Sequence, residues 1–214
     1  MAVQDRKDRE FQRREQDILT AALRLFNSDN WQTVTIEEIA QAAEIGKGTV
    51  YTHFASKDEI YARLTIDFGT RLLEQLRALD YSRHVLAILT EIIGLFWNSH
   101  LSSPAQHRLF QHCDRPDFKQ GVTAETRRQF ESVDAEIMGL IGGVLQRGID
   151  QGLFPRKPIE LLVLPAQAAV MGGIQIFLSG CVAAIDPDQF LTEITQFILA
   201  GLLNQDALRR ATVA

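Results

Sequence analysis

The chain has 214 residues, of which 46% are hydrophobic and 23% are charged. This composition is enough for a full core in one or two soluble domains, and it excludes a mainly disordered protein. The net charge of -5 excludes nucleic-acid binding through overall charge, so such binding needs a local surface. Cys113 and Cys181 lie far apart, and the N-terminus lacks a secretory signal pattern. We therefore expect a reduced, cytoplasmic location.

The first 30 residues predict one helix and its end. Residues 1 to 14 are highly charged and alternate in sign, which is typical of a frayed arm or a first helical turn, and such an arm could reach a minor groove. Apolar residues then recur at helical spacing until Phe26, and turn-forming residues from Asn27 to Asn30 end the helix. Trp31 is expected to pack in the core of this first domain.

Two short helices and the start of a third are predicted between residues 35 and 59. Thr35 followed by Glu38 fits a capping box at a helix start. Ser56 followed by Glu59 repeats the pattern. Each short helix also has one apolar face, formed by Ile36, Ile39, Ala40 and Ala43 in the first and by Val50 and Phe54 in the second. This arrangement predicts a helix-turn-helix.

The second short helix leaves a polar face that contains no acidic residue between Ile45 and Lys57. Phosphates and base edges present mainly hydrogen-bond acceptors, so this face suits double-stranded DNA. The alternative, an ordinary solvated face, would be favoured if the helix stood alone. We expect Thr35, Tyr51 and Lys57 to hold phosphates. The residues expected nearest the bases are Lys47, Thr49, Thr52 and His53, with Gly48 beside them and Lys47 as the best candidate for a guanine contact.

In this stretch the chain resembles the TetR family of transcriptional regulators. The matching residues are Thr35, Ile36, Ile39, Ala40, Ala43, Gly48, Val50, Tyr51, His53, Phe54, Ser56, Lys57 and Asp58. The resemblance covers about the first 65 residues, and its most specific part is Y-x-H-F followed by S-K-D. It implies an all-helical homodimer whose N-terminal domains bind a palindromic operator and whose C-terminal domains bind an effector.

The sequence departs from the family pattern in the turn, where Glu44 stands at a position that usually holds Gly. Two explanations are open. Glu44 adopts a left-handed conformation at a cost on the order of 1 kcal/mol, or Gly46 makes the bend instead.

The rest of the chain predicts further helices and no strand. A fourth helix is expected from Ser56 to about Leu79, and Ser103 and Asp186 each stand as a capping residue before a proline. Pro158 fits the first position of a helix in the same way. The later apolar-periodic stretches are 83 to 101, 104 to 113, 123 to 151, 158 to 181 and 187 to 203.

The run from Leu161 to Ile185 has no formally charged residue, so a membrane span is an alternative for it. One proline, several glycines and polar residues within the run, and the lack of a flanking basic cluster, argue against a span. A helix that is apolar all round is expected where two subunits pack. In the resembled family the last two long helices form the dimer bundle, which here implies residues 158 to 181 and 187 to 203.

Three chemical patterns are incomplete. The stretch from Gly46 to Thr49 lacks the first glycine of a phosphate loop. His100, His107, His112 and Cys113 lack the i, i+4 spacing of a helical metal site, and no nucleophile signature of an enzyme appears. We therefore expect no cofactor, no metal and no catalytic residue.

The helices after residue 80 mix large apolar residues with a few polar ones, which suits a small, largely apolar effector. Plain core packing is an equally good explanation for each residue alone. The candidate pocket residues are Phe96, Trp97, His100, Phe110, Cys113, Met138, Met171, Gln175 and Phe177.

Together these patterns predict an all-α protein with a three-helix helix-turn-helix domain at residues 1–60 and a helical effector-binding and dimerisation domain at residues 61–214. The predicted function is a DNA-binding transcriptional regulator, acting as a homodimer and most simply as a ligand-released repressor. The alternatives are a helical small-molecule or lipid-binding protein or enzyme with a vestigial DNA-binding domain, and a membrane-anchored protein.

Overall fold

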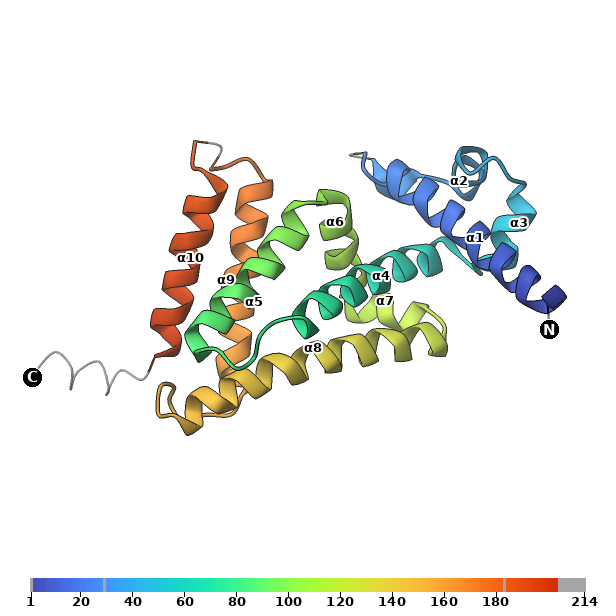
Figure 1. The fold of residues 1–214 in the computed structure, drawn as a ribbon. Coiled ribbons are helices and arrows are strands. Elements are labelled where there is room, and N and C mark those ends of the chain that lie inside the picture. The colour runs from blue at the N-terminus through green and yellow to red at the C-terminus, as the bar shows by residue number, and fades with distance from the viewer. Residues whose placement is uncertain (1, 29, 183, 204–214) are drawn as a thin grey trace, which may run out of the picture. The chain divides into compact units, whose positions relative to one another are not determined.

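The computed structural model describes residues 2–28, 30–182 and 184–203, which form ten α-helices and one short 3-10 helix (Figure 1). No strand occurs in this described part of the chain. The predicted all-helical fold class is confirmed. Asp29, part of the predicted end of the first helix, lies outside the described residues.

The chain divides into two compact units. The first contains Met1–Gly69 and Ser103–Glu131, and the second contains Thr70–Ser102 and Ser132–Ala214. The first unit thus holds all of the predicted DNA-binding domain, together with the start of the fourth helix and a later segment of the chain. The domain boundary predicted at residue 60 remains a prediction.

The first unit is built around the predicted helix-turn-helix. Its elements are α1 (Ala2–Leu25), the 3-10 helix η1 (Trp31–Thr33), α2 (Ile36–Ala42), α3 (Lys47–His53), the start of α4 (Lys57–Arg77), α6 (Pro104–Cys113), α7 (Pro116–Gly121) and the start of α8 (Ala124–Asp150). Because α1 begins at Ala2, the charged N-terminal residues continue this helix and do not form a frayed arm. The elements η1 and α7 were not predicted from the sequence.

An aromatic cluster closes the core of this unit. Trp31 is only 8% exposed, which agrees with its predicted place in the core. Its ring centroid lies 5.3 Å from that of Tyr61 on α4 and 5.3 Å from that of His112 on α6. The centroid of Phe26, which follows α1, lies 4.8 Å from that of Tyr61. Helix α6 therefore completes the core around α1 and α4, although it is remote from both in the sequence.

The second unit contains the rest of α4 and α8 together with α5 (Val85–Leu101), α9 (Glu160–Leu178) and α10 (Pro187–Leu202). Helices α5, α9 and α10 lie side by side (Figure 1). The capping pattern predicted for α10 is present, because the Asp186 carboxylate accepts hydrogen bonds from the backbone N–H groups of Asp188 and Gln189 at 3.0 Å. Helix α9 begins two residues after Pro158, so this proline is not at its first position.

A close approach after α8 requires glycine in this unit. A Cβ atom added to Gly148 would lie 2.2 Å from the ring of Phe154, a side chain that is 1% exposed. Such a distance is far inside van der Waals contact, so no larger residue fits without moving the ring. Gly148 thereby lets the chain after α8 fold back onto the helix.

Candidate nucleic-acid interface and ligand cavity

The start of α2 has the predicted capping box. The Thr35 hydroxyl accepts a hydrogen bond from the backbone N–H of Glu38, and the Glu38 carboxylate accepts one from the backbone N–H of Thr35 at 2.7 Å. Ile36, Ile39 and Val50 are buried, and α2 packs against α3. The predicted helix-turn-helix is therefore present in the structure.

The turn between α2 and α3 places Glu44 in the left-handed region, with a φ of 56°. The Ile45 N–H donates to the Ala40 carbonyl at 3.0 Å, and the Glu44 N–H donates to the Gln41 carbonyl at 3.1 Å. These two bonds form a Schellman motif, whose left-handed position is usually glycine. Gly46 has an ordinary φ of -73°. The structure thus selects the first explanation offered for the departure at Glu44.

Replacing Glu44 with Gly is expected to raise the free energy of unfolding by about 1 kcal/mol, because glycine adopts positive φ without steric cost. Urea denaturation of the full chain measures this change. Glu44→Ala is the matched control, since it removes the same carboxylate but keeps a Cβ atom at the strained position. Equal stabilisation by both variants would show that charge, and not backbone strain, sets the stability of the turn.

The exposed face of α3 carries most of the predicted DNA-binding residues. Lys47, Gly48 and Thr52 are exposed, Tyr51 is 48% exposed, and Thr49 is half-buried. The Lys47 ammonium forms an ion pair with Glu37 of α2 and lies 5.8 Å from the centroid of the Tyr51 ring. The Thr52 hydroxyl donates to the Gly48 carbonyl at 3.1 Å. The Lys47 side chain is 49% exposed and its ammonium has three N–H donors, so the ion pair with Glu37 competes with another anion but does not exclude one.

His53 and Lys57 are placed differently from the other predicted residues. The His53 ring centroid lies 4.0 Å from that of Phe11 on α1, and its buried Nδ1 has no hydrogen-bond partner. Burial lowers the pKa of His53, so the ring is mainly neutral at neutral pH. The Lys57 ammonium donates to the carbonyls of Gln32 at 2.7 Å and Val34 at 3.0 Å. His53 thus supports α3 from behind, and Lys57 ties α4 to the segment around η1.

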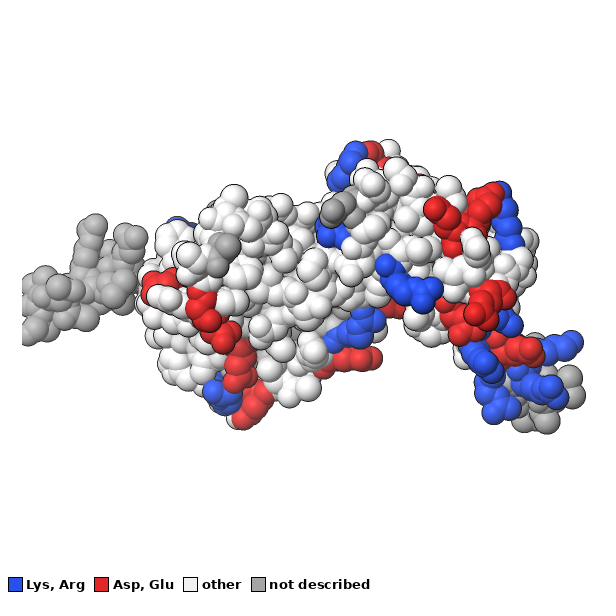
Figure 2. All heavy atoms as spheres, turned by 90° about the horizontal axis from the view of Figure 1, so that it is seen from above, with Lys and Arg blue, Asp and Glu red and all other residues white. Residues whose placement is uncertain are grey.

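The charges around this interface are mixed. Figure 2 shows Lys and Arg side chains gathered at the right-hand end, where α1 begins, with Asp and Glu beside them. The side chains of Arg6, Lys7 and Arg9 are exposed there. The first unit therefore presents no uniform basic surface in this view, as expected from the acidic balance of the sequence.

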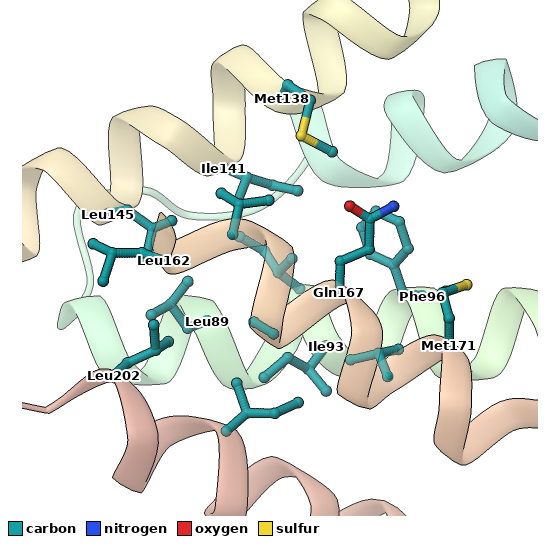
Figure 3. Close-up of a pocket in the computed structure, with 15 residues that line it drawn as sticks. Leu89, Ile93, Phe96, Met138, Ile141, Leu145, Leu162, Gln167, Met171 and Leu202 are labelled. Carbon is teal, nitrogen blue, oxygen red and sulfur yellow. The ribbon is translucent and has the colours of Figure 1, made fainter. Parts of the chain in front are cut away.

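The second candidate site is a cavity of about 80 Å³ inside the second unit. It is lined from α5, α8, α9 and α10 (Figure 3). Its lining residues are Leu89, Ile92, Ile93, Phe96, Met138, Ile141, Leu145, Leu162, Val163, Ala166, Gln167, Val170, Met171, Ile198 and Leu202. Gln167 is the one polar residue among them. The arrangement suits a small apolar molecule.

Three of the nine predicted pocket residues, Phe96, Met138 and Met171, line this cavity. Trp97 is 1% exposed and instead packs with Phe177 and Phe190, at centroid distances of 5.8 and 5.6 Å. These rings form part of the core beside α10. Sequence reasoning missed Gln167, because its chain neighbours gave no sign of which face of α9 turns inward.

The remaining four predicted pocket residues lie elsewhere. His100 is buried at 1% exposure, and Gln175 is exposed on α9. Phe110 and Cys113 belong to α6 in the first unit and are not among the residues that line this cavity. Burial raises the pKa of the Cys113 thiol to about 12, which makes it an unreactive core residue. The described residues contain no cluster of three or more potential metal ligands.

Helix α9 also has an exposed apolar face. Leu161 is 60% exposed, Leu164 is 58% exposed and Ile176 is 47% exposed, and exposed Ala168 and Gly172 lie between them. We call these five residues the α9 stripe. By length and composition α9 is also the one described helix that could cross a membrane unaided, which is weak evidence for a span. Exposed apolar patches of this kind commonly mark protein interfaces.

Comparison with known proteins identifies the family. Residues 18–64 match the family model of bacterial regulatory proteins, tetR family. The chain is 34% identical over 143 residues to the HTH-type transcriptional regulator YhgD of Bacillus subtilis (strain 168), covering 67% of this chain and 72% of that protein. It is 28% identical over 157 residues to YfiR of the same organism, covering 70% of this chain and 73% of that protein.

The fold comparison agrees with the sequence comparison. The structure matches a bacterial regulatory protein in the tetR family from Rhodococcus RHA1 with a TM-score of 0.73 at 17% identity, over 88% of this chain and 96% of that one. The resemblance predicted from the helix-turn-helix residues is therefore confirmed. The chain belongs to the TetR family and is a DNA-binding transcriptional regulator.

Proposed function

We propose that the protein is a homodimeric repressor in the cytoplasm, that a small apolar molecule releases it from its operator, and that it has no enzymatic activity. The single observation that carries this proposal is the apolar cavity in the second unit, whose wall from four helices contains one polar side chain. Filling a cavity stabilises the state that contains it, so a ligand there can shift an equilibrium that also affects DNA binding.

We assign the DNA contacts to the exposed face of α3. Lys47, Thr49 and Thr52 approach the base edges, and Lys47 is the candidate for a guanine O6/N7 contact in competition with its ion pair to Glu37. A Cβ atom at Gly48 would have open space around it, so this glycine leaves room for close approach of DNA. Tyr51 binds a phosphate through its exposed hydroxyl.

Lys57 adds a phosphate contact at the end of the helix-turn-helix. The Thr35 N–H and hydroxyl both donate to the Glu38 carboxylate, at 2.7 and 2.9 Å, so Thr35 reaches a phosphate only by exchanging that partner. Lys57 uses two of its three N–H donors on backbone carbonyls, which leaves one for a phosphate oxygen. We assign His53 a supporting role, because its ring contacts Phe11 and not the exposed face of α3.

The dimer is proposed to form through α9 and α10, with the α9 stripe at its centre. A two-fold dimer presents two copies of α3, which fit half-sites separated by roughly 34 Å, one turn of DNA. Each copy alone offers few basic residues, so the affinity depends on both copies binding together. Dimerisation thus compensates for the acidic balance of the chain.

The protein is predicted to bind the DNA upstream of its own gene in preference to other sequences. This binding should weaken as the salt concentration rises. It should also be reversed by n-octanol, which serves as a probe of the cavity. Fluorescence anisotropy should show affinity falling about 5- to 150-fold on saturation with octanol, the usual range of coupling between two sites. By reciprocity, DNA must weaken octanol binding by the same factor. Octanol binding without sequence-preferring DNA binding would favour the alternative of a helical lipid-binding protein or enzyme.

Tyr51→Ala serves as the variant that assigns DNA binding to α3. It is expected to weaken binding to all DNA sequences by a similar factor, about tenfold, because a phosphate contact carries no sequence information. Tyr51→Phe should show most of this loss, since it removes only the hydroxyl. Light scattering on both variants should still report the dimer, and dissociation would show that Tyr51 belongs to an interface between subunits.

A further inference from the structure

The chemistry of the cavity wall restricts which ligand it can hold. Among the lining residues there is no Lys, Arg, His, Asp or Glu, and Gln167 supplies the one polar side chain. We propose that the ligand is a neutral, mostly apolar molecule with one hydrogen-bonding group that pairs with Gln167, and that the cavity rejects carboxylates. This inference rests on the proposed function of the cavity as the effector site.

Gln167 is placed to meet a ligand. It lies on the half-buried side of α9, and Figure 3 draws its side chain among those that line the cavity, together with Phe96, Met138 and Met171. Within the described residues no hydrogen bond to this amide is present. The residue is half-buried, so its amide is free to pair with an incoming hydroxyl, ketone or amide that enters the cavity. The amide can donate as well as accept, which allows any of these groups.

An anionic ligand lacks a comparable partner. Transfer of a carboxylate from water into an apolar site costs several kcal/mol or more unless a cation or several hydrogen bonds receive it. One amide cannot replace the hydration of two carboxylate oxygens. A fatty acid anion would therefore stay outside or bind only after taking up a proton.

The cavity of about 80 Å³ is smaller than an eight-carbon alcohol, so its wall must move to admit one. Met138 is 38% exposed and contributes a flexible thioether to the lining, as does Met171. Unbranched thioethers repack at low cost, so chains or rings of somewhat different shape can be accepted. The cavity then selects its ligand by charge and by the single polar contact more than by the shape of the ligand.

The test compares n-octanol with octanoate, which share a chain and differ in charge at neutral pH. Isothermal titration of the full-length protein should show octanol binding at least about tenfold more tightly than octanoate. Gln167→Leu should weaken octanol binding about five- to tenfold, which is the usual contribution of one hydrogen bond. Gln167→Arg should reverse the preference in favour of octanoate, because a guanidinium pairs with a carboxylate.

Gln175→Leu is the matched control, since this glutamine is exposed on the same helix and should leave both affinities unchanged. Equal or tighter binding of octanoate by the wild type, or unchanged octanol binding in Gln167→Leu, would overturn the neutral-ligand inference while leaving the cavity as the effector site. If the wild type binds neither probe, the proposed effector role of the cavity fails as well. Because Gln167→Leu keeps the cavity apolar, the test stands even if Gln167→Arg does not fold.

Discussion

A carboxylate at the centre of the α9 stripe, introduced by Ala168→Glu, is expected to convert the proposed dimer into a folded monomer and to lower operator affinity by at least about 100-fold. In a two-fold interface each substitution occurs twice, so two unpaired charges would be buried near the axis. Burying a charge without a partner costs more than such an interface can offset. Because two monomers would then bind the two half-sites independently, the loss of operator affinity exceeds that caused by removing any single contact.

The choice of Ala168 follows from the composition of the stripe. Exposed Ala168 and Gly172 are small and lie between large exposed residues, which allows two helices to approach closely at that point. No residue from Leu161 to Ile185 carries a formal charge that could receive the new carboxylate. Phe197 of α10 is 73% exposed, and burial of this ring in the same interface would account for its position.

Light scattering and operator titration measure the two effects of Ala168→Glu. The expected mass is near 24.1 kDa, that of one chain, with an unchanged helical circular dichroism spectrum. Ala135→Glu is the matched control, because Ala135 is an exposed alanine inside α8 and outside the stripe. An intact dimer in Ala168→Glu would place the subunit interface elsewhere.

The helices of this protein were predictable because their signals are local. Apolar spacing and capping residues indicated α2, α3 and α10 within a few residues of their observed bounds. Helix α7 has six residues, which is too short to display a period, and it was missed. The sequence showed only that Glu44 departs from the glycine usual at this position. It could not show whether Glu44 or Gly46 makes the bend, because the backbone conformation is not visible in the sequence.

The sequence indicated an apolar site in the later helices, but it did not indicate which residues line the cavity. Phe96 lines it, whereas Trp97, the next residue, points about 100° further around α5 and packs against Phe177. Which of two neighbouring apolar residues faces a cavity depends on how four helices pack together. Composition alone cannot supply that information, and for the same reason it gave no sign of Gln167.

Glu59 shows how a distant contact can override a local pattern. The Ser56 hydroxyl accepts a hydrogen bond from the Glu59 N–H at 3.2 Å, which is half of the predicted capping box. The Glu59 carboxylate does not return the bond to Ser56. It accepts hydrogen bonds from the Thr123 N–H at 2.7 Å and from the Thr126 hydroxyl at 2.5 Å. The second predicted capping box is therefore wrong in its reciprocal half, because the carboxylate instead caps the start of α8.

Removing this carboxylate by Glu59→Ala is expected to destabilise the first turn of α8 by about 2 kcal/mol, the usual range for hydrogen bonds to a charged group. Two donors lose their acceptor, and Thr123 alone remains to cap the helix through its bond with the Thr126 N–H. Hydrogen exchange measures the change directly. Amides in the first turn of α8 should exchange roughly 30-fold faster than in the wild type.

Two comparisons test whether the bonds from Glu59 cause this effect. Glu125→Ala removes an exposed carboxylate from the same turn. The ion pair of this carboxylate with Arg128 should contribute less than about 1 kcal/mol to the stability of the helix. Combining Glu59→Ala with Thr126→Val should cost less than the sum of the two single changes, with a coupling of about 1 kcal/mol. Similar exchange rates in Glu59→Ala and Glu125→Ala would contradict the specific role of Glu59.

The consequence for regulation follows from helix continuity. Helix α8 runs without interruption from the turn held by Glu59 to the cavity residues Met138 and Ile141, and α4, which carries Glu59, begins four residues after α3 ends. A carboxylate that fixes the start of α8 to the first turn of α4 therefore connects a helix that lines the cavity to the segment that follows α3. In Glu59→Ala, octanol should bind with unchanged affinity but lower operator affinity less than in the wild type, and an unchanged effect on DNA would remove Glu59 from the regulatory connection.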